Sequence, residues 1–183
     1  MNQNKETVAL FEDKVRENLV SFLQHKGVLD MRLPECPDVE ERWGEIAREY
    51  LPDGAREFQN YPVVSLGWMM FIGMAMARYW DVDWLMYSQR HDLYAGMRDI
   101  RGYDNMDEAI VEEVLGYSGD DAERISSLAA ECASRVYSLL THEHVEPGTE
   151  AALGCYIAAL HQLYLAGMMI ELNALGYHMS PMD

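Results

Sequence analysis

The sequence predicts an all-α fold, a single-domain bundle of six or seven helices over residues 1–183. No segment alternates apolar and polar side chains for long enough to indicate a β-strand. Two segments, residues 62–80 and residues 149–175, are apolar on nearly every side when they are read at helical spacing. A helix of that kind has to be surrounded by protein or by lipid. We therefore expect residues 62–80 to form a buried central helix packed against residues 149–175.

Composition limits the classes of function. The length lies within the usual range of one domain, and no repeat or linker divides the chain. The chain carries 31 acidic and 14 basic residues, a net charge of −17 at pH 7. Nucleic-acid binding needs clustered Lys and Arg to contact phosphates, so we expect no nucleic-acid partner. Residues 105–183 hold 13 of the acids and only two of the bases, which predicts one strongly negative face.

The cysteines and the N-terminal segment both indicate a cytoplasmic protein. Cys36, Cys132 and Cys155 are an odd set without CxxC spacing, which supports neither a disulfide framework nor a structural zinc site. The first 15 residues lack a basic region followed by an apolar run, so they do not resemble a signal peptide. We expect reduced thiols, with Cys132 and Cys155 in the core.

A membrane protein is the alternative that the apolar segments raise. Residues 59–77 and 151–170 are each about as long as a spanning helix, which needs about 20 apolar residues. However, the second segment contains His161 and Gln162, and neither segment is flanked by the Lys and Arg excess that orients a spanning helix. We therefore expect both to be core helices, and no membrane partner.

Two helices are predicted before the central one. Residues 5–26 place apolar side chains at three- and four-residue steps, and Gly27 is suited to end that helix. Asp38 followed by Glu41 has the spacing of a capping box, which predicts a second helix from that point. We expect it to stop at residues 51–54, because that segment contains a proline and a glycine.

Turn residues divide the chain after the central helix. Asp81 or Asp83 can cap a helix over residues 83–97. Glycines and an Asp-Asn pair then separate it from a helix over residues 105–117. The next helix is expected over residues 121–141, and a turn joins it to the last one.

A polar and aromatic cluster directly after the central helix is the main candidate for a ligand site. On a helix over residues 83–97, four of its side chains share one face: Asp83, Tyr87, Arg90 and Tyr94. Carboxylate, guanidinium and phenol groups beside aromatic rings suit a small polar ligand. The candidate ligand-binding residues are Asp83, Trp84, Tyr87, Arg90, His91 and Tyr94. The same side chains could instead form ion pairs and ring contacts at the edge of the core.

The two arginines of this region are expected to differ in role. Each either pairs with a nearby aspartate or meets an anionic ligand. Arg78 lies on the last turn of the central helix, where a cation suits the helix dipole, so we expect a structural ion pair. Arg90 lies beside His91, and we expect it to face the ligand.

Metal and cofactor sites are not expected. The turn residues His142, His144 and Glu146 are of types that bind zinc, but neighbouring loop residues need a scaffold to converge. No histidine follows a glutamate at the spacing of di-iron bundles. Phosphate-binding, dinucleotide-binding, zinc-protease and hydrolase motifs are absent, so no catalytic residue is assigned.

The two apolar helices carry small residues, including Gly67 and Gly73, that permit close helix approach. We expect simple core packing, with His161 hydrogen-bonded and structural. The alternative is a ligand space beside Ser65, His161, Gln162 and Tyr164.

The leading hypothesis is a non-catalytic cytoplasmic helical binding or interaction protein. One alternative is a helical enzyme that binds a small molecule through the cluster at residues 78–94. Another is an acidic inhibitor or immunity-type protein for a basic protein partner. A homodimer is also predicted, because two apolar helices and 13 methionines exceed what a bundle of this size easily buries.

Overall fold

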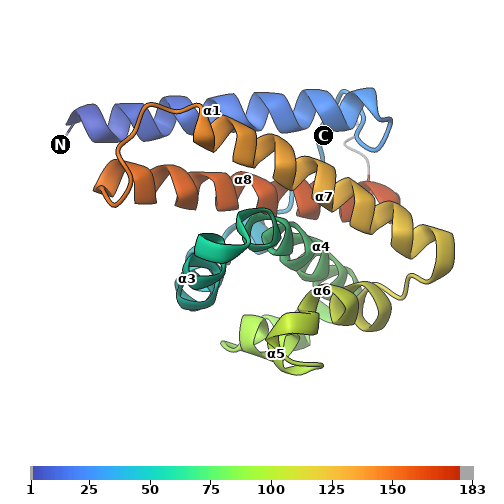
Figure 1. The fold of residues 1–183 in the computed structure, drawn as a ribbon. Helices are drawn as coiled ribbons and strands as arrows, with labels where there is room; N and C mark the ends of the chain where they lie inside the picture. Colours follow the sequence, from blue (N-terminus) through green and yellow to red (C-terminus); the bar gives the residue numbers. More distant parts are fainter. Residues whose placement is uncertain (1, 178–183) are drawn as a thin grey trace.

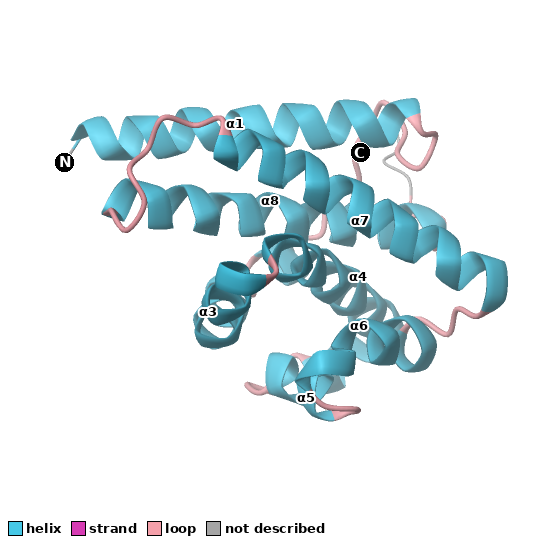
Figure 2. Cartoon of the chain, in the orientation of Figure 1, coloured by secondary structure: helices cyan, strands magenta, loops and turns pink. Residues whose placement is uncertain are grey.

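The computed structural model describes residues 2–177, and in that range it contains helices and loops but no strand (Figure 2). The eight α-helices of the described residues are α1 (Asn2–His25), α2 (Pro37–Glu40), α3 (Trp43–Asn60), α4 (Pro62–Tyr87), α5 (Leu93–Asp99), α6 (Met106–Ala109), α7 (Gly119–Thr141) and α8 (Glu150–Ala174). A 3₁₀ turn, Tyr103–Asn105, precedes α6, and a π-helical turn, Ile110–Val114, follows it. The all-α prediction is confirmed. Helices α2 and α6 are single turns, and the other six match the predicted number.

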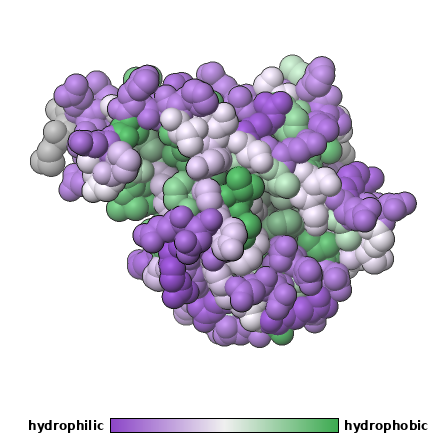
Figure 3. Space-filling model, viewed as in Figure 1, coloured by the Kyte–Doolittle hydropathy of each residue, from purple (hydrophilic) through white to green (hydrophobic). Residues whose placement is uncertain are grey.

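The helices form two groups around α4. Helices α1, α7 and α8 lie side by side, and α3, α5 and α6 lie on the other side of the molecule (Figure 1). Helix α4 contacts α8, α7 and α3, so it occupies the centre as predicted. Figure 3 shows hydrophilic residues over most of the visible face, with hydrophobic residues gathered where the two groups meet.

Every residue of α4 from Ser65 to Ala77 is buried. It packs most extensively against α8, which confirms the predicted pair. Glycine makes this packing possible: a Cβ atom on Gly73 would lie 2.1 Å from the carbonyl oxygen of Tyr164, and one on Gly167 would lie 2.0 Å from the carbonyl oxygen of Met70. The two main chains are therefore in direct contact, and the alternative of a ligand space beside these glycines is wrong.

Helix α8 is long and apolar enough to cross a membrane by length and composition alone. Two-thirds of its most apolar stretch (67%) is buried against the rest of the protein. The central helix of a folded bundle meets the same criterion, so this length is weak support for a membrane span.

The expected end of the second helix at residues 51–54 is wrong. Helix α3 continues through Pro52 to Asn60 because packing on both sides of the proline holds it. The Tyr50 ring lies directly over Gly54, where a Cβ atom would be 2.3 Å away, and Phe58 packs on Tyr156 with ring centroids 4.8 Å apart. Tertiary contacts thus outweigh the helix-breaking preference of proline.

The predicted cap at Asp38 is also wrong. A separate turn, α2, starts at Pro37, and the Glu40 carboxylate accepts from the Cys36 backbone N–H at 3.0 Å. The Asp38 carboxylate instead accepts from Trp80 Nε1 at 3.0 Å, which ties α2 to α4. The three cysteines are free and buried, as expected.

The predicted helix over residues 83–97 is interrupted. Helix α4 runs past residue 80 to Tyr87 with a kink at Asp83, whose φ is −165° and ψ is 76°. The Asp83 carboxylate accepts from the Met86 N–H at 3.2 Å, so Asp83 does cap the last turn as predicted. Residues 88–92 then form a loop, and α5 begins at Leu93.

Candidate functional site

The six predicted ligand-binding residues lie on three separate parts of the chain. Asp83, Trp84 and Tyr87 are at the end of α4, Arg90 and His91 are in the loop, and Tyr94 is in α5. The predicted common face does not form, because residues 88–92 are a loop and α5 begins only at Leu93. The Arg42 guanidinium donates to the carbonyl oxygens of Ser88 and Arg90 in this loop, the second at 3.0 Å.

Tyr94 belongs to the scaffold between α3 and α5. It is fully buried, its hydroxyl donates to Asp53 Oδ2 at 2.8 Å, and its ring meets the Tyr50 ring edge-on at 5.4 Å. Arg98 lies 3.4 Å from the same Asp53 oxygen. Burial, together with the hydrogen bond to Asp53, raises the pKa of the Tyr94 hydroxyl far above its ordinary value of 10.

Trp84 and Tyr87 are held by contacts within the chain. The Arg42 guanidinium lies over the Trp84 ring at 5.4 Å from its centroid. The Tyr87 ring stacks on the Tyr79 ring at 4.1 Å. These are the ring contacts at a core edge that the sequence left open as an alternative.

Arg90 and His91 are exposed and weakly engaged. Arg90 Nε lies 3.1 Å from Asp92 Oδ1, and both side chains face solvent. His91 Nδ1 lies 3.7 Å from Glu45 Oε1. Exposed pairs of this kind contribute little to stability, and the Arg90 guanidinium also lies against Gly96 of α5.

Arg78 forms the ion pair that was predicted for it, with an unexpected partner. One of its terminal nitrogens lies 3.0 Å from Oε1 of Glu171 in α8, rather than from an aspartate. The Tyr117 hydroxyl donates to the same carboxylate at 2.9 Å, and Glu171 is only 1% exposed. Burial raises the pKa of Glu171, while Tyr117 and Arg78 act in the opposite direction. Burial and the Glu171 charge raise the pKa of Tyr117 to about 12.

His161 is hydrogen-bonded, as expected. Its Nδ1 donates to Glu12 Oε2 at 2.9 Å, and the Gln162 amide donates to the same oxygen at 2.7 Å. The Trp43 ring stacks on the imidazole at 4.8 Å. The carboxylate orients the histidine between α1, α3 and α8.

The other groups of the alternative ligand space are also partnered. Ser65 Oγ donates to the Gly54 carbonyl at 2.7 Å and lies 2.6 Å from the Tyr156 hydroxyl. The Tyr164 hydroxyl donates to the Val39 carbonyl at 2.7 Å. These bonds join α2, α3, α4 and α8 and satisfy polar groups that are buried in the core.

No group of three or more His, Cys, Asp or Glu side chains within residues 2–177 is arranged to hold a metal ion. In the turn after α7, His142 Nδ1 lies 2.7 Å from the Ser138 carbonyl oxygen, so that ring nitrogen is used within the chain. An open surface depression of about 500 Å³ lies between α1 and α7, and none of its lining residues belongs to the predicted cluster.

The feature that sequence reasoning missed is an exposed apolar turn. Val82, Leu85 and Met86 are 64%, 80% and 49% exposed, although the same helix is completely buried over residues 65–77. We call residues 82–86 the α4 terminal turn. Tyr177 lies beside it, with its ring 5.2 Å from that of Trp80 and its hydroxyl 2.5 Å from Asp81 Oδ1. The sequence does contain a signal for this turn. Leu85 and Met86 follow Val82 at three- and four-residue spacing, and Val82 lies between Asp81 and Asp83.

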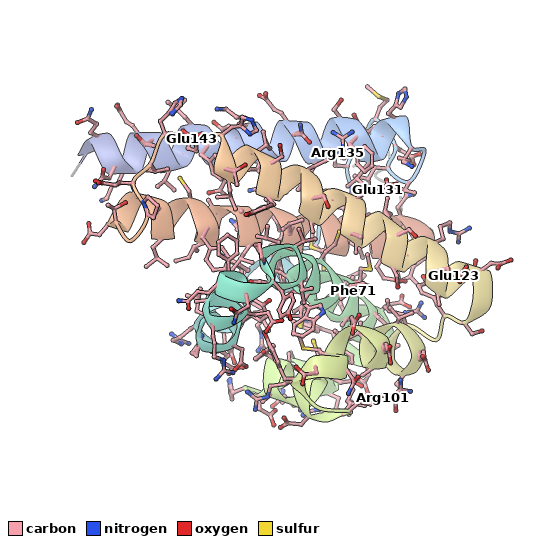
Figure 4. The ribbon with its side chains drawn as sticks, viewed as in Figure 1. Phe71, Arg101, Glu123, Glu131, Arg135 and Glu143 are labelled. Carbon is pink, nitrogen blue, oxygen red and sulfur yellow. The ribbon has the colours of Figure 1, made fainter. Side chains whose placement is uncertain are left out.

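Helix α7 holds four acids and two bases, and the π-helical turn holds Glu112 and Glu113. Glu123 and Glu131 lie along α7 with Arg135, and Arg101 lies near α6 (Figure 4). Several acids there are paired: Arg101 lies 3.2 Å from Glu112, and Lys26 lies 3.3 Å from Glu131.

No protein-family model, curated protein or solved structure matches this chain.

Proposed function

We propose that this protein is a non-catalytic interaction protein that binds another protein chain through the α4 terminal turn. The observation that supports the proposal is the exposure of Val82, Leu85 and Met86 within five residues of each other. Single exposed apolar side chains are common on proteins, but adjacent ones are typical of interaction sites.

The state of the polar cluster also favours binding over catalysis. Tyr94, Tyr87 and Trp84 each contact side chains of the same chain and support the fold. A small-molecule site needs convergent polar groups in a concave pocket. Here Asp83, Arg90 and His91 are exposed, and Arg90 and His91 lie in the loop that follows the apolar turn.

The expected affinity is modest. Covering three partly exposed aliphatic side chains contributes roughly 3–6 kcal/mol at the usual value per buried side chain. Association costs at least about 4 kcal/mol in lost translational and rotational freedom. A complex that depends on this turn alone is therefore weak, and stronger binding needs polar contacts around it.

Photo-crosslinking in cells tests the proposal. A photoreactive benzoylphenylalanine at position 85 should form covalent adducts with protein. The matched control is position 10, because Leu10 is 69% exposed but lies on α1, away from the turn. Adducts at position 85 and not at position 10 support the proposal.

Native mass spectrometry supplies the opposing result. A metabolite that stays bound to the wild-type chain and is lost from Arg90→Ala, together with no protein adduct at position 85, would favour the ligand-binding enzyme instead.

A further inference from the structure

The seam between α1 and α7 is lined by a row of three polar pairs, and the middle pair lacks an acid. At both ends of the row a lysine of α1 lies near a glutamate, at 3.4 and 3.3 Å, in the pairs Lys14–Glu143 and Lys26–Glu131. Between them, Arg135 donates to the neutral side-chain oxygen of Asn18 at 3.3 Å. Figure 4 shows Glu143, Arg135 and Glu131 in that order along the seam. No carboxylate of residues 2–177 forms a salt bridge with Arg135, so its charge is not balanced within this row.

Uncharged groups hold the Arg135 side chain in place. Its guanidinium lies over the Phe22 ring, 4.0 Å from the ring centroid, and Phe22 itself packs against the core. One terminal nitrogen donates to Asn18, and the other two guanidinium nitrogens have no acceptor among residues 2–177. A stacked and oriented guanidinium loses less conformational freedom on binding an anion than a mobile side chain does.

Arg135 lines the open depression of about 500 Å³ between α1 and α7. A volume of this size falls within the range of small-molecule sites. The ammonium of Lys26 and the hydroxyl of Ser134 line the same depression. Guanidinium, ammonium and hydroxyl donors around one space suit a group that carries several anionic oxygens.

Glu131 is the acid among the residues that line the depression, and it lies 3.3 Å from Lys26. Those two side chains are 47% and 45% exposed. An exposed pair contributes little to stability, so an incoming anion can take Lys26 from Glu131 at small cost. Two bases and one acid give the depression a local charge of +1, in a chain whose net charge is −17.

We propose that the depression between α1 and α7 binds a phosphate monoester of a small molecule. The phosphate lies in the fork of Arg135, and its remaining oxygens meet Lys26 and Ser134. Phosphate is favoured over carboxylate because it offers three terminal oxygens to the three donors. The site is formed by α1 and α7, apart from the α4 terminal turn, so it does not depend on the proposed function.

Titration with inorganic phosphate, followed by NMR at constant ionic strength, tests the site. At about pH 8 a phosphate group carries close to two negative charges. The Ser134 amide and the Arg135 Nε–H resonances of the wild type should shift together and saturate. A dissociation constant of about 1–10 mM is expected, because the depression is open to solvent. Glycerol phosphate should bind at least as tightly, and acetate should bind about fivefold more weakly because it lacks the third oxygen.

Two variants test the role of Arg135, with the Ser134 amide as the reporter. Arg135→Gln should weaken phosphate binding about tenfold. Asn18→Asp should weaken it by a similar factor although the arginine is kept, because the new carboxylate completes the row of ion pairs. Arg124→Gln is the matched control: it removes the other base of α7, which lies 3.0 Å from Asp121, and it should leave binding unchanged. Amide spectra that otherwise match the wild type show that the variants are folded.

Four outcomes would overturn the proposal or part of it. A wild-type chain without a saturable shift up to about 30 mM phosphate has no such site. Unchanged binding in Asn18→Asp, or an equal loss in Arg124→Gln, would show that phosphate does not use the Arg135 fork. Acetate that binds as tightly as phosphate would overturn the choice of phosphate. A phosphoserine peptide that binds about tenfold more tightly than glycerol phosphate would replace the small molecule by a phosphorylated protein.

Discussion

Glu171 is the residue whose environment differs most from that of an ordinary surface acid. It is almost fully buried in an apolar helix, and Arg78 and Tyr117 contact its two oxygens. Replacing a buried ion pair by apolar residues is often harmless, but removing one partner leaves a charge uncompensated. Removing a partner of Glu171 should therefore lower the stability of the fold.

Arg78→Ala should lower the free energy of unfolding by about 2–4 kcal/mol, because it leaves the Glu171 carboxylate buried with only the Tyr117 hydroxyl. Arg90→Ala should change it by less than about 0.5 kcal/mol, because the Arg90–Asp92 pair is exposed. Urea denaturation of both variants measures the difference. Equal destabilisation would show that Arg90 is part of the scaffold and not available for contact with a partner.

The pH dependence of stability should report the same carboxyl group. Burial raises the folded-state pKa of Glu171 above its ordinary value of 4.5. The folded state then holds a proton that the unfolded state has lost, so this group favours folding below about pH 4.5, and its contribution is lost as pH rises through the folded-state pKa.

Glu171→Gln cannot titrate and should lack this loss. The free energy of unfolding of the wild type, minus that of Glu171→Gln, should decrease between pH 4.5 and neutral pH. Parallel denaturation series at several pH values check this. A difference that increases with pH would mean that Arg78 and Tyr117 outweigh burial.

At the scale of elements, the α4–α8 contact depends on glycine at two positions. The approach at Gly73 involves the main chain of α8, which cannot move aside as a flexible side chain can. Gly67 is not packed as closely, because a Cβ atom there would lie 3.5 Å from Ala133 Cβ, which is an ordinary van der Waals distance.

Gly73→Ala should therefore destabilise the protein by about 1–3 kcal/mol through overpacking. Gly67→Ala is the matched control in the same helix, and it should stabilise the protein by about 0.5–1 kcal/mol because alanine favours a helix over glycine. Chemical denaturation distinguishes the two. A neutral or stabilising Gly73→Ala would show that α4 and α8 can separate without cost.

The elements that the sequence predicted well are those whose own residues determine them. Helices α4 and α8 are long and apolar, and helix α7 has a strong three- and four-residue pattern, so their cores were predicted within a few residues. The continuation of α3 through Pro52 and the break at residues 88–92 depend on contacts from elsewhere in the chain.

The candidate site was harder to predict for the same reason. Arg78 and Glu171 are 93 residues apart in the chain, and Tyr94 finds its partner Asp53 at a separation of 41. No local pattern specifies such pairs. The exposed turn was missed because the apolar run before it predicts burial, whereas exposure already begins at Asp81 and Val82, ahead of the kink at Asp83.

On the scale of the whole molecule, charge and apolar surface are separated. Of the net charge of −17, −11 lies in the last 79 residues of the chain, and the exposed apolar turn lies within residues 61–104, which hold five acids and four bases. Net charge of one sign keeps proteins soluble, and the proposed contact with another protein uses the small apolar area that this charge leaves open.

The central position of α4 also has a consequence during protein synthesis. Its main cover, α8, ends 87 residues after α4 ends, at residue 174 against residue 87. At 5–20 residues per second, the ribosome needs about 4–17 s to make that stretch. For that time a helix whose residues 65–77 are all buried in the folded protein has left the ribosome without the partner whose main chain it must touch. Nascent chains stalled after residue 140 should therefore bind a ribosome-associated chaperone, and chains extended by a linker that carries residue 174 out of the ribosome should release it. Equal chaperone binding at both lengths would show that α4 is shielded by the first helices alone.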